Sequence, residues 1–333
     1  MIQAQEFEII PNSDSLKVVF QNESEIREFS VYRGYLTSEE IENKKPIIGK
    51  THQNNREVVF YPLVPFSTTL PYTVLIDNIC YYFNLEIPED YTYLKVIKIL
   101  PSTKQWPENM LKFHIQFNKA VSLPFFCNHI QFISEDNDLL AGIILDLGQI
   151  LVNDEDNLVT LWIEPGRQKK GIAPNVELDS PFQIGKNYSI RIKASLKDKG
   201  GIPMQSDYSH PFQIKEADRT SPKPEKWKIK TPLKDSTFPI EINLQEDLDY
   251  KSVLSSVKIQ LESKTIKGRL KYQFDQQKVL FYPNLPWEKG NYLIFVDKEL
   301  EDLAGNNLER LFDEDIKSKT KAITNYTYNF TIE

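Results

Sequence analysis

Carboxylates are the commonest residues in this sequence that could carry out chemistry. They gather in short acidic runs: Glu135 to Asp138, Asp154 to Asp156, Asp297 to Asp302, and Asp313 to Asp315. Two carboxylates can hydrolyse a glycosidic bond, but only across a cleft and at a fixed separation, which a sequence does not show. Calcium needs about six to eight oxygen ligands, and Asp154–Asn157, or Asp302 with Asn306, would form only partial cages. We therefore interpret these runs as solvated turns and predict no metal and no cofactor.

Histidine and cysteine do not form a recognisable site either. The four histidines (His52, His114, His129 and His210) lack ligand spacing, and two cysteines alone cannot hold zinc. We predict that Cys80 and Cys127 are buried free thiols, with a disulfide between them as the alternative. His114 lies with Lys112 and Gln116 on the polar face of the alternating stretch Met110–Phe117, so we expect it to point to solvent or to a groove. The sequence has no nucleophile elbow, P-loop or dinucleotide fingerprint, and we predict that the protein is not an enzyme.

A basic loop is the most unusual segment. Between Gly166 and Asn175, glycines and prolines flank three cations, Arg167, Lys169 and Lys170. Long loops on rigid sandwiches often carry function, and a guanidinium suits bidentate contacts with carboxylates. One interpretation is a recognition loop for an anionic or carbohydrate partner; the other is a structural loop pinned between domains. Trp106 is the candidate aromatic for ligand stacking, because its loop setting is expected to leave it facing solvent.

The segment from Lys278 to Asn307 predicts the elements that would position such residues. Lys278 to Tyr282 alternates as a strand with two apolar faces, and Pro283 ends it because proline cannot donate to a ladder. A second strand is expected from Tyr292 to Asp297. The run Asp302 to Asn306 then predicts a tight turn with a buried Leu303.

Two weaker copies of this segment lie upstream. The first has strands at Glu57–Pro62 and Tyr72–Asp77; the second has strands at Leu158–Pro165 and Tyr188–Ile192. In the second copy, Asp198–Pro203 takes the place of the Asp302 turn. Each copy follows a glycine that we expect in a polar turn: Gly49, Gly142 and Gly268. The repeat predicts three related β-modules in a row.

The modules are expected at residues 1–90, 91–216 and 217–333. The first is divergent, and the second is lengthened by insertions after Gly142 and from Gly166 to Ile184. Linkers are expected at Leu85–Asp90 and at Ala217–Lys226, where prolines favour an extended chain. Leu36–Lys45 is expected to be either a loop or a short helix capped by Thr37 or Ser38, and Asp249 can cap a single helical turn from Tyr250 to Leu254. Tyr326–Ile332 is expected to be the last strand.

Composition excludes several classes of protein. A chain of 333 residues is long enough for two or three domains, and 40% hydrophobic with 12% aromatic residues suits a globular β-protein. With 40 basic and 47 acidic residues the net charge is −7, and no long basic run exists, so nucleic-acid binding is disfavoured. No apolar run is long enough for a transmembrane helix. No signal peptide is present on this chain, and we expect that a leader has been removed.

The repeat resembles the bacterial Ig-like domains of surface-layer and envelope proteins. Their hallmarks are a strand ending in proline, an apolar residue, a glycine turn, a tyrosine-led strand and an Asp-x-Ala-Gly-Asn loop. The third module matches throughout, the second lacks Ala-Gly-Asn, and the first has Asn78–Phe83 in place of the loop. From Met110 onward the chain also resembles an uncharacterised family of secreted bacterial Ig-like proteins. The segments that carry this likeness are Trp162–Gly171, Ala217–Trp227 and Glu301–Asn306.

This resemblance implies an all-β fold of three tandem Ig-like sandwiches and a non-enzymatic, exported cell-envelope protein. Its role would be that of a structural spacer or of a module that binds a protein or ligand. One alternative is a carbohydrate-binding module that uses exposed Trp106 and the loop 166–175; another is a hydrolase with its site at a domain junction. The implied partner is another envelope protein or a glycan. The implied location is the periplasm or the cell surface, with a lipid anchor as one option.

Overall fold

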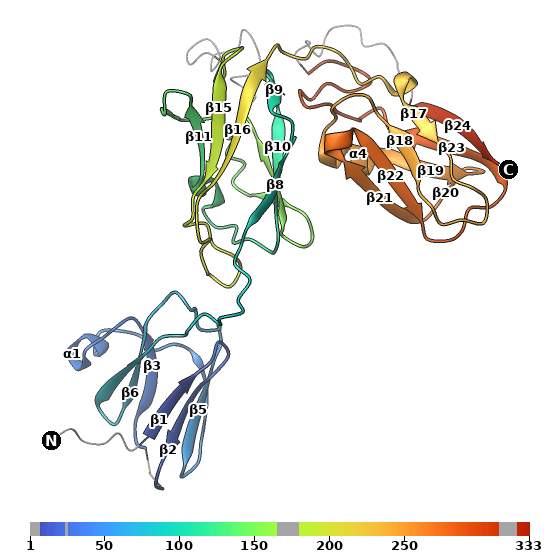
Figure 1. Cartoon of the computed structure of the whole chain (residues 1–333). Helices are drawn as coiled ribbons and strands as arrows, with labels where there is room; N and C mark the ends of the chain where they lie inside the picture. Colours follow the sequence, from blue (N-terminus) through green and yellow to red (C-terminus); the bar gives the residue numbers. More distant parts are fainter. Residues whose placement is uncertain (1–6, 24–25, 165–179, 313–324) are drawn as a thin grey trace. The chain divides into compact units, whose positions relative to one another are not determined.

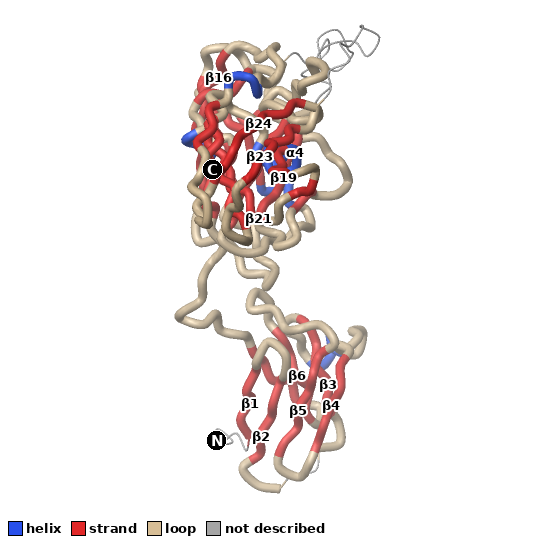
Figure 2. Tube along the Cα trace, turned by 90° about the vertical axis from the view of Figure 1, so that its right-hand side faces the viewer, coloured by secondary structure: helices blue, strands red, loops and turns tan. Residues whose placement is uncertain are grey.

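The computed structural model describes residues 7–23, 26–164, 180–312 and 325–333. The chain divides into two compact units, one of residues 1–94 with 197–205 and one of residues 95–196 with 206–333. Almost all of the regular structure is strand, arranged as paired antiparallel sheets (Figures 1 and 2). The prediction of an all-β fold with three tandem Ig-like sandwiches is confirmed. The predicted boundaries at 90 and 216 stay predictions.

The first sandwich has the strand order of a constant-type immunoglobulin domain. One sheet has the order β1-β2-β5-β4 and the other β3-β6-β7, which corresponds to strands A-B-E-D and C-F-G. The elements are β1 (Phe7–Pro11), β2 (Leu16–Phe20), β3 (Phe29–Arg33), α1 (Ser38–Ile41), β4 (Gly49–Gln53), β5 (Glu57–Pro62), β6 (Tyr72–Ile76) and β7 (Ile79–Phe83).

The second sandwich keeps this order and adds strands. Its sheets are β13-β14-β10-β8 and β12-β11-β15-β16-β9, and β9 pairs in parallel with β16. The elements are β8 (Val96–Leu100), β9 (Gln105–Pro107), β10 (Lys112–Phe117), η1 (Phe126–His129), β11 (Ile130–Ser134), β12 (Leu139–Leu140), β13 (Leu151–Val152), β14 (Leu158–Trp162), β15 (Asn187–Ile192) and β16 (Tyr208–Lys215).

The third sandwich has sheets β17-β18-β22-β21 and β20-β19-β23-β24. Its elements are η2 (Pro224–Lys226), β17 (Lys228–Lys230), β18 (Ile240–Asn243), α4 (Tyr250–Ser256), β19 (Val257–Leu261), β20 (Lys264–Thr265), β21 (Gly268–Gln273), η3 (Phe274–Gln276), β22 (Lys278–Pro283), β23 (Gly290–Val296) and β24 (Tyr326–Ile332). The expected helix caps are confirmed: the side chains of Thr37 and Asp249 accept hydrogen bonds from the first turns of α1 and α4. None of the described helices is long and apolar enough to cross a membrane.

A tyrosine corner recurs in all three sandwiches. The hydroxyl oxygen of Tyr72 accepts a hydrogen bond from the N–H of Ser67 at 2.6 Å. Tyr188 and Tyr292 accept equivalent bonds from Gln183 at 3.0 Å and Glu288 at 3.2 Å. Each tyrosine ring stacks on an aromatic ring of the last strand of its sandwich, which is Phe83, Phe212 or Phe330. This feature confirms the tyrosine-led strand of the sequence repeat, since such corners mark the F strand of Ig-type sandwiches.

Gly49 and Gly268 occupy equivalent places, but in strands rather than in the turns we expected. They open β4 and β21. A Cβ at either position would lie 2.4 Å from the carbonyl oxygen of Tyr61 or Tyr282 and 2.5 Å from the neighbouring phenylalanine ring. Only glycine fits here, because the backbone of the next strand passes so closely. Gly142, by contrast, does lie at a bend, with φ +64°.

The loop before the last strand has one geometry in the second and third sandwiches. In the third, Asp302 N–H donates to the Asn306 carbonyl, and the Asn306 N–H donates back to Asp302 Oδ1 at 2.9 Å. In the second sandwich, the Asp198 N–H likewise donates to the Ile202 carbonyl, and the Ile202 N–H donates back to Asp198 Oδ1. The fourth residue of each loop has a positive φ, and in both loops it is glycine: Gly201 and Gly305. The prediction that Asp198–Pro203 replaces the Asp302 turn is confirmed.

Candidate functional site

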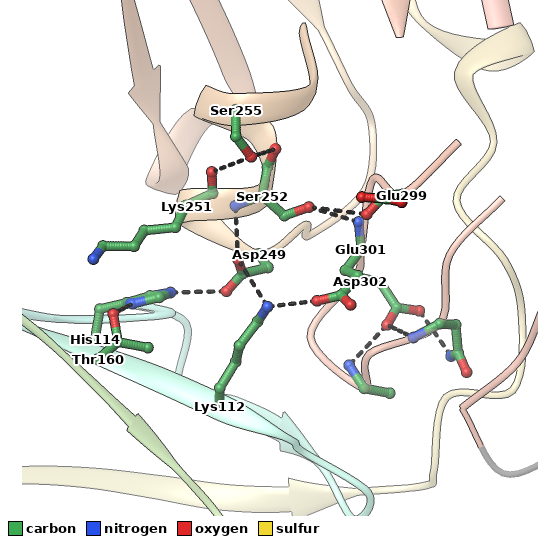
Figure 3. A network of polar contacts seen from close by, with 12 residues as sticks. Lys112, His114, Thr160, Asp249, Lys251, Ser252, Ser255, Glu299, Glu301 and Asp302 are labelled. Atoms are coloured by element: carbon green, nitrogen blue, oxygen red, sulfur yellow. Dashed lines mark hydrogen bonds and ion pairs between the residues drawn. The ribbon is translucent and has the colours of Figure 1, made fainter. Parts of the chain in front are cut away.

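A buried polar joint connects the second and third sandwiches within the second compact unit (Figure 3). On β10 the residues Phe113, Ile115 and Phe117 face the core, so Lys112 and His114 lie on the opposite face. His114 is nevertheless only 2% exposed. It hydrogen-bonds to Asp249, which caps α4. The expectation that His114 points to solvent or a groove is therefore wrong, because the polar face of β10 meets the third sandwich.

Asp249 is the centre of this joint. Its carboxylate lies 2.8 Å from His114 Nε2 through Oδ2 and 3.3 Å from Lys112 Nζ through Oδ1. Oδ1 also accepts the N–H of Ser252 at 2.8 Å, the capping bond of α4. Burial raises the pKa of the Asp249 carboxyl, but His114, Lys112 and Ser252 outweigh burial, and the net pKa lies below its usual value. One buried carboxylate thus binds two groups of the second sandwich while it caps a helix of the third.

Lys112 extends the joint to the loop that follows β23. Its Nζ lies 2.5 Å from Glu301 Oε2 and 5.1 Å from the centre of the Trp162 ring. Burial lowers the pKa of Lys112, whereas Asp249 and Glu301 raise it, and the net pKa is raised. The N–H of Glu301 in turn donates to Ser252 Oγ at 2.8 Å. The ammonium therefore stays charged and connects β10 with both α4 and the loop.

Thr160, His114 and Asp249 form a line of hydroxyl, imidazole and carboxylate. Thr160 Oγ1 lies 2.9 Å from His114 Nδ1, on the other side of the ring from Asp249. Such a line activates a nucleophile when the hydroxyl is open to substrate. Here Thr160 is 7% exposed on β14, and it lines neither the cavity beside Asp218 and Glu246 nor the one beside Glu135 and Tyr188. In this setting the hydroxyl fixes the orientation of the imidazole.

Further hydrogen bonds to the backbone stabilise the same joint beside this network. The N–H of Leu111 donates to the carbonyl of Leu303 at 3.0 Å. The side-chain amide of Asn109 donates to the carbonyl of the linker residue Asp218 at 2.7 Å and accepts the Asp218 N–H at 2.9 Å. Asn306 Nδ2 donates to the same Asp218 carbonyl at 3.0 Å. The loop after β23 therefore fits against the end of the second sandwich through directed bonds as well as charges. Leu303 is buried, as predicted.

Asp302 lies within this loop and is 4% exposed, so the interpretation of this acid as part of a solvated turn is wrong. Its carboxylate accepts the N–H of Ala304 at 2.8 Å and of Asn306 at 2.9 Å, and also the Asn306 side-chain amide at 2.8 Å. Burial outweighs these donors and raises the pKa of Asp302 to about 7. Among the residues that the structure describes, no three His, Cys, Asp or Glu side chains are grouped as a metal would require.

A cavity of about 490 Å³ opens beside the linker at this junction. Its lining includes four carboxylates and three lysines: Asp218, Glu246, Asp247, Asp302, Lys215, Lys223 and Lys226. Glu246 Oε1 accepts the indole N–H of Trp227 at 3.0 Å, and burial raises the pKa of this glutamate. This is where the hydrolase alternative would place its acids, but each carboxylate already accepts a bond from the chain itself.

Of the binding residues predicted from the sequence, only Trp106 lies within the part of the chain that the structure describes. Arg167, Lys169 and Lys170 lie outside the described residues, so the basic recognition loop stays a prediction. Trp106 is 0% exposed; its ring stacks on Phe212 with centroids 4.2 Å apart, and its Nε1 donates to the Thr103 carbonyl. The expectation that Trp106 faces solvent is wrong, because its segment forms β9 and pairs with β16.

The two cysteines are free, as predicted, and half-buried. Burial raises the pKa of the Cys127 thiol, which lowers its reactivity at neutral pH. Lys112 and Glu301 were not anticipated as members of a site. The sequence feature that could have indicated Lys112 was its place beside His114 on the polar face of a predicted strand. Alternation alone does not show that another domain covers that face.

No protein-family model and no curated protein matches this sequence. Three solved structures of tandem domains illustrate the likeness in fold. The N-terminal part of the bacterial S-layer protein SbsC is 10% identical with a TM-score of 0.26, and the match covers 73% of this chain and 44% of that one. Titin domains A168–A170 are 11% identical with a TM-score of 0.27, covering 89% and 91%. Chicken CNTN1 domains FN1–FN3 are 10% identical with a TM-score of 0.21, covering 98% and 97%. These scores are low, and the fold assignment rests on the strand orders given above.

Proposed function

We propose that this chain is a non-enzymatic, exported envelope protein whose tandem Ig-like sandwiches act as a spacer. In this proposal the buried joint makes the second and third sandwiches a single stiff segment. The observation that carries the proposal is the carboxylate of Asp249, which binds His114 and Lys112 of the second sandwich while it caps α4 of the third.

The stiffness follows from the cost of breaking such a joint. Any rotation of one sandwich against the other would leave the Asp249 carboxylate and the Lys112 ammonium buried without partners. Removing one partner of a buried ion pair typically costs about 3–5 kcal/mol. Because hydrogen bonds from α4 and from the loop after β23 converge on the same face of β10, only one relative orientation satisfies all of them.

The exported location is supported by the resemblance of the repeated segment to envelope-type Ig-like domains. The carbohydrate-binding alternative loses Trp106 as its exposed aromatic, and its basic loop stays untested. A full-length gene product that remains in the cytoplasm on cell fractionation would contradict the location.

Pulsed electron resonance between two spin labels tests the stiff joint directly. The native cysteines would be replaced by Cys80→Ser and Cys127→Ser, and labels attached through Leu139→Cys in the second sandwich and Leu233→Cys in the third. Both positions are exposed, at 61% and 79%. We expect one narrow distance distribution, which Asp249→Ala broadens.

The matched control for this experiment is Glu241→Ala. Glu241 is paired with Lys230 and Lys278 on the surface of the third sandwich, away from the joint residues, so its loss should leave the distribution narrow. A broad distribution in the chain with an intact joint would overturn the spacer proposal.

A further inference from the structure

The last strand of the third sandwich is an edge strand, and no described strand pairs with its outer side. β24 ends the sheet β20-β19-β23-β24, and Tyr326–Ile332 contains neither a charged residue nor a proline. Sheet edges are normally guarded by charges, prolines or covering segments, because their unpaired peptide groups bind other strands. The other edge strands of this sandwich follow that rule; they are β17, β20 and β21, with Lys228, Lys264 and Arg269.

The equivalent strand of the second sandwich, β16, is protected twice. Phe212 and Phe330 are equivalent, because each stacks on the corner tyrosine of its sandwich and is that tyrosine's register partner. Just before Phe212, Pro211 offers no N–H to a neighbour. Just after it, β9 pairs with Gln213–Lys215 and covers the edge. The third sandwich has Asn329 in place of Pro211 and no described strand in place of β9.

Pro211 also shows which peptide groups of β24 point outward. A proline inside a sheet must have its nitrogen directed away from the ladder. The equivalent Asn329 therefore directs its N–H and C=O away from β23. Since strand residues alternate with a period of two, Thr327 and Thr331 do the same. All three side chains are exposed.

The sequence around this edge is nearly symmetric. On either side of Asn329 stand an aromatic residue and then a threonine, in the order Thr327, Tyr328, Asn329, Phe330, Thr331. We propose that β24 pairs with β24 of a second copy, antiparallel, about a two-fold axis at Asn329. In that register Asn329 faces Asn329 of the second copy, and Thr327 faces Thr331 of the second copy.

A second copy fits this edge better than an unrelated strand does. A two-fold interface requires a self-complementary surface, and a nearly symmetric strand provides one. In this register Thr327, Asn329 and Thr331 each form a hydrogen-bonded antiparallel pair, in which the two facing residues exchange both N–H···O bonds. Threonine pairs across strands are favourable, and no like charges oppose each other. The pairing would join two four-stranded sheets into one continuous sheet.

Sedimentation velocity of the full chain over a concentration series tests this proposal. We expect the sedimentation coefficient to rise from that of a monomer to that of a dimer. Asn329→Pro should abolish the rise, because it removes the outward N–H at a position where β16 already carries a proline. Asn329→Thr, which keeps the N–H and suits a strand, should dimerise. Circular dichroism melting identifies any variant that fails to fold.

A charge-swap experiment at Asn329 tests whether the two-fold axis of the dimer lies at this residue. Asn329→Lys and Asn329→Glu should each be monomeric, because each variant places like charges opposite each other in its own dimer. An equal mixture of the two should restore the dimer, since lysine then faces glutamate. The proposal is overturned by a wild-type chain that stays monomeric at every concentration. It is equally overturned by a dimer that survives Asn329→Lys, or by a mixture that remains monomeric.

Discussion

At the scale of single residues, Asp249 shows how a helix cap can also join two domains. A capping carboxylate needs only one oxygen for the backbone, and here the other oxygen binds His114 of another sandwich. Lys112 shares the first oxygen and adds a positive charge. The charge of Asp249 is thus compensated from both sides, which explains how a 1% exposed carboxylate keeps a pKa below its usual value.

Asp302 is the acid for which we predict a measurable pH dependence. Its pKa is about 7 in the folded chain, against an ordinary value of 3.8. Between these values the folded state holds a proton that the unfolded state releases, so the free energy of unfolding should fall as the pH rises through this window. The slope from this group is at most about 1.4 kcal/mol per pH unit.

Urea unfolding of the wild type and Asp302→Asn at several pH values from about 4 to about 8 measures this effect. We expect the variant to lose most of the decline, because asparagine does not ionise. The low pKa of Asp249 and the high pKa of Lys112 lie outside the window. Glu246, whose pKa burial raises, and His210, whose pKa burial lowers, change protonation within it in both chains, so the difference between the two chains isolates Asp302. A difference in the free energy of unfolding between wild type and Asp302→Asn that does not fall from pH 4 to pH 7 would contradict a raised pKa at Asp302.

At the scale of elements, the close approach of β21 and β22 depends on Gly268. A methyl group at this position would meet the backbone carbonyl of Tyr282 at 2.4 Å and the ring of Phe281 at 2.5 Å. Backbone atoms cannot move aside as a side-chain end can. We therefore expect Gly268→Ala to lower the free energy of unfolding by about 1–3 kcal/mol.

The matched control is Gly290→Ala at the start of β23. Its nearest neighbour is the flexible end of Leu261, at 3.0 Å, so this change should cost less than Gly268→Ala in the same chemical denaturation experiment. Equal losses for the two variants would mean that the close approach of the Tyr282 carbonyl does not make Gly268 more sensitive than Gly290.

The strands, and the tyrosine that begins the repeated second strand, could be predicted from the sequence because their causes are local. Proline ends β22, alternation defines β10, and each tyrosine bonds to a backbone N–H a few residues upstream. Two of the wrong expectations concern which neighbouring residues cover one face of a strand. Trp106 is buried by the parallel pairing of β9 with β16, and His114 by α4, more than a hundred residues further along the chain. Periodicity identifies the faces of a strand, whereas its neighbours come from tertiary packing.

At the scale of the whole molecule, the two compact units predict two thermal transitions in calorimetry. Unfolding enthalpies near 60 °C scale at about 0.7 kcal/mol per residue, so the first unit should contribute about 70 kcal/mol and the second about 160 kcal/mol. The second and third sandwiches should unfold together, because the ion pairs and hydrogen bonds of Asp249 with Lys112 and His114 are lost when either sandwich unfolds.

Lys112→Met should split the larger transition into two, since the variant removes the ammonium that connects β10 with α4 and with Glu301. Lys230→Met is the control: its exposed ion pair with Glu241 is a surface contact of the kind that contributes less than about 1 kcal/mol, and two transitions should remain. Three separate transitions in the unaltered chain would mean that the joint does not couple the sandwiches. The network would then orient two independently folding domains without making them one cooperative unit.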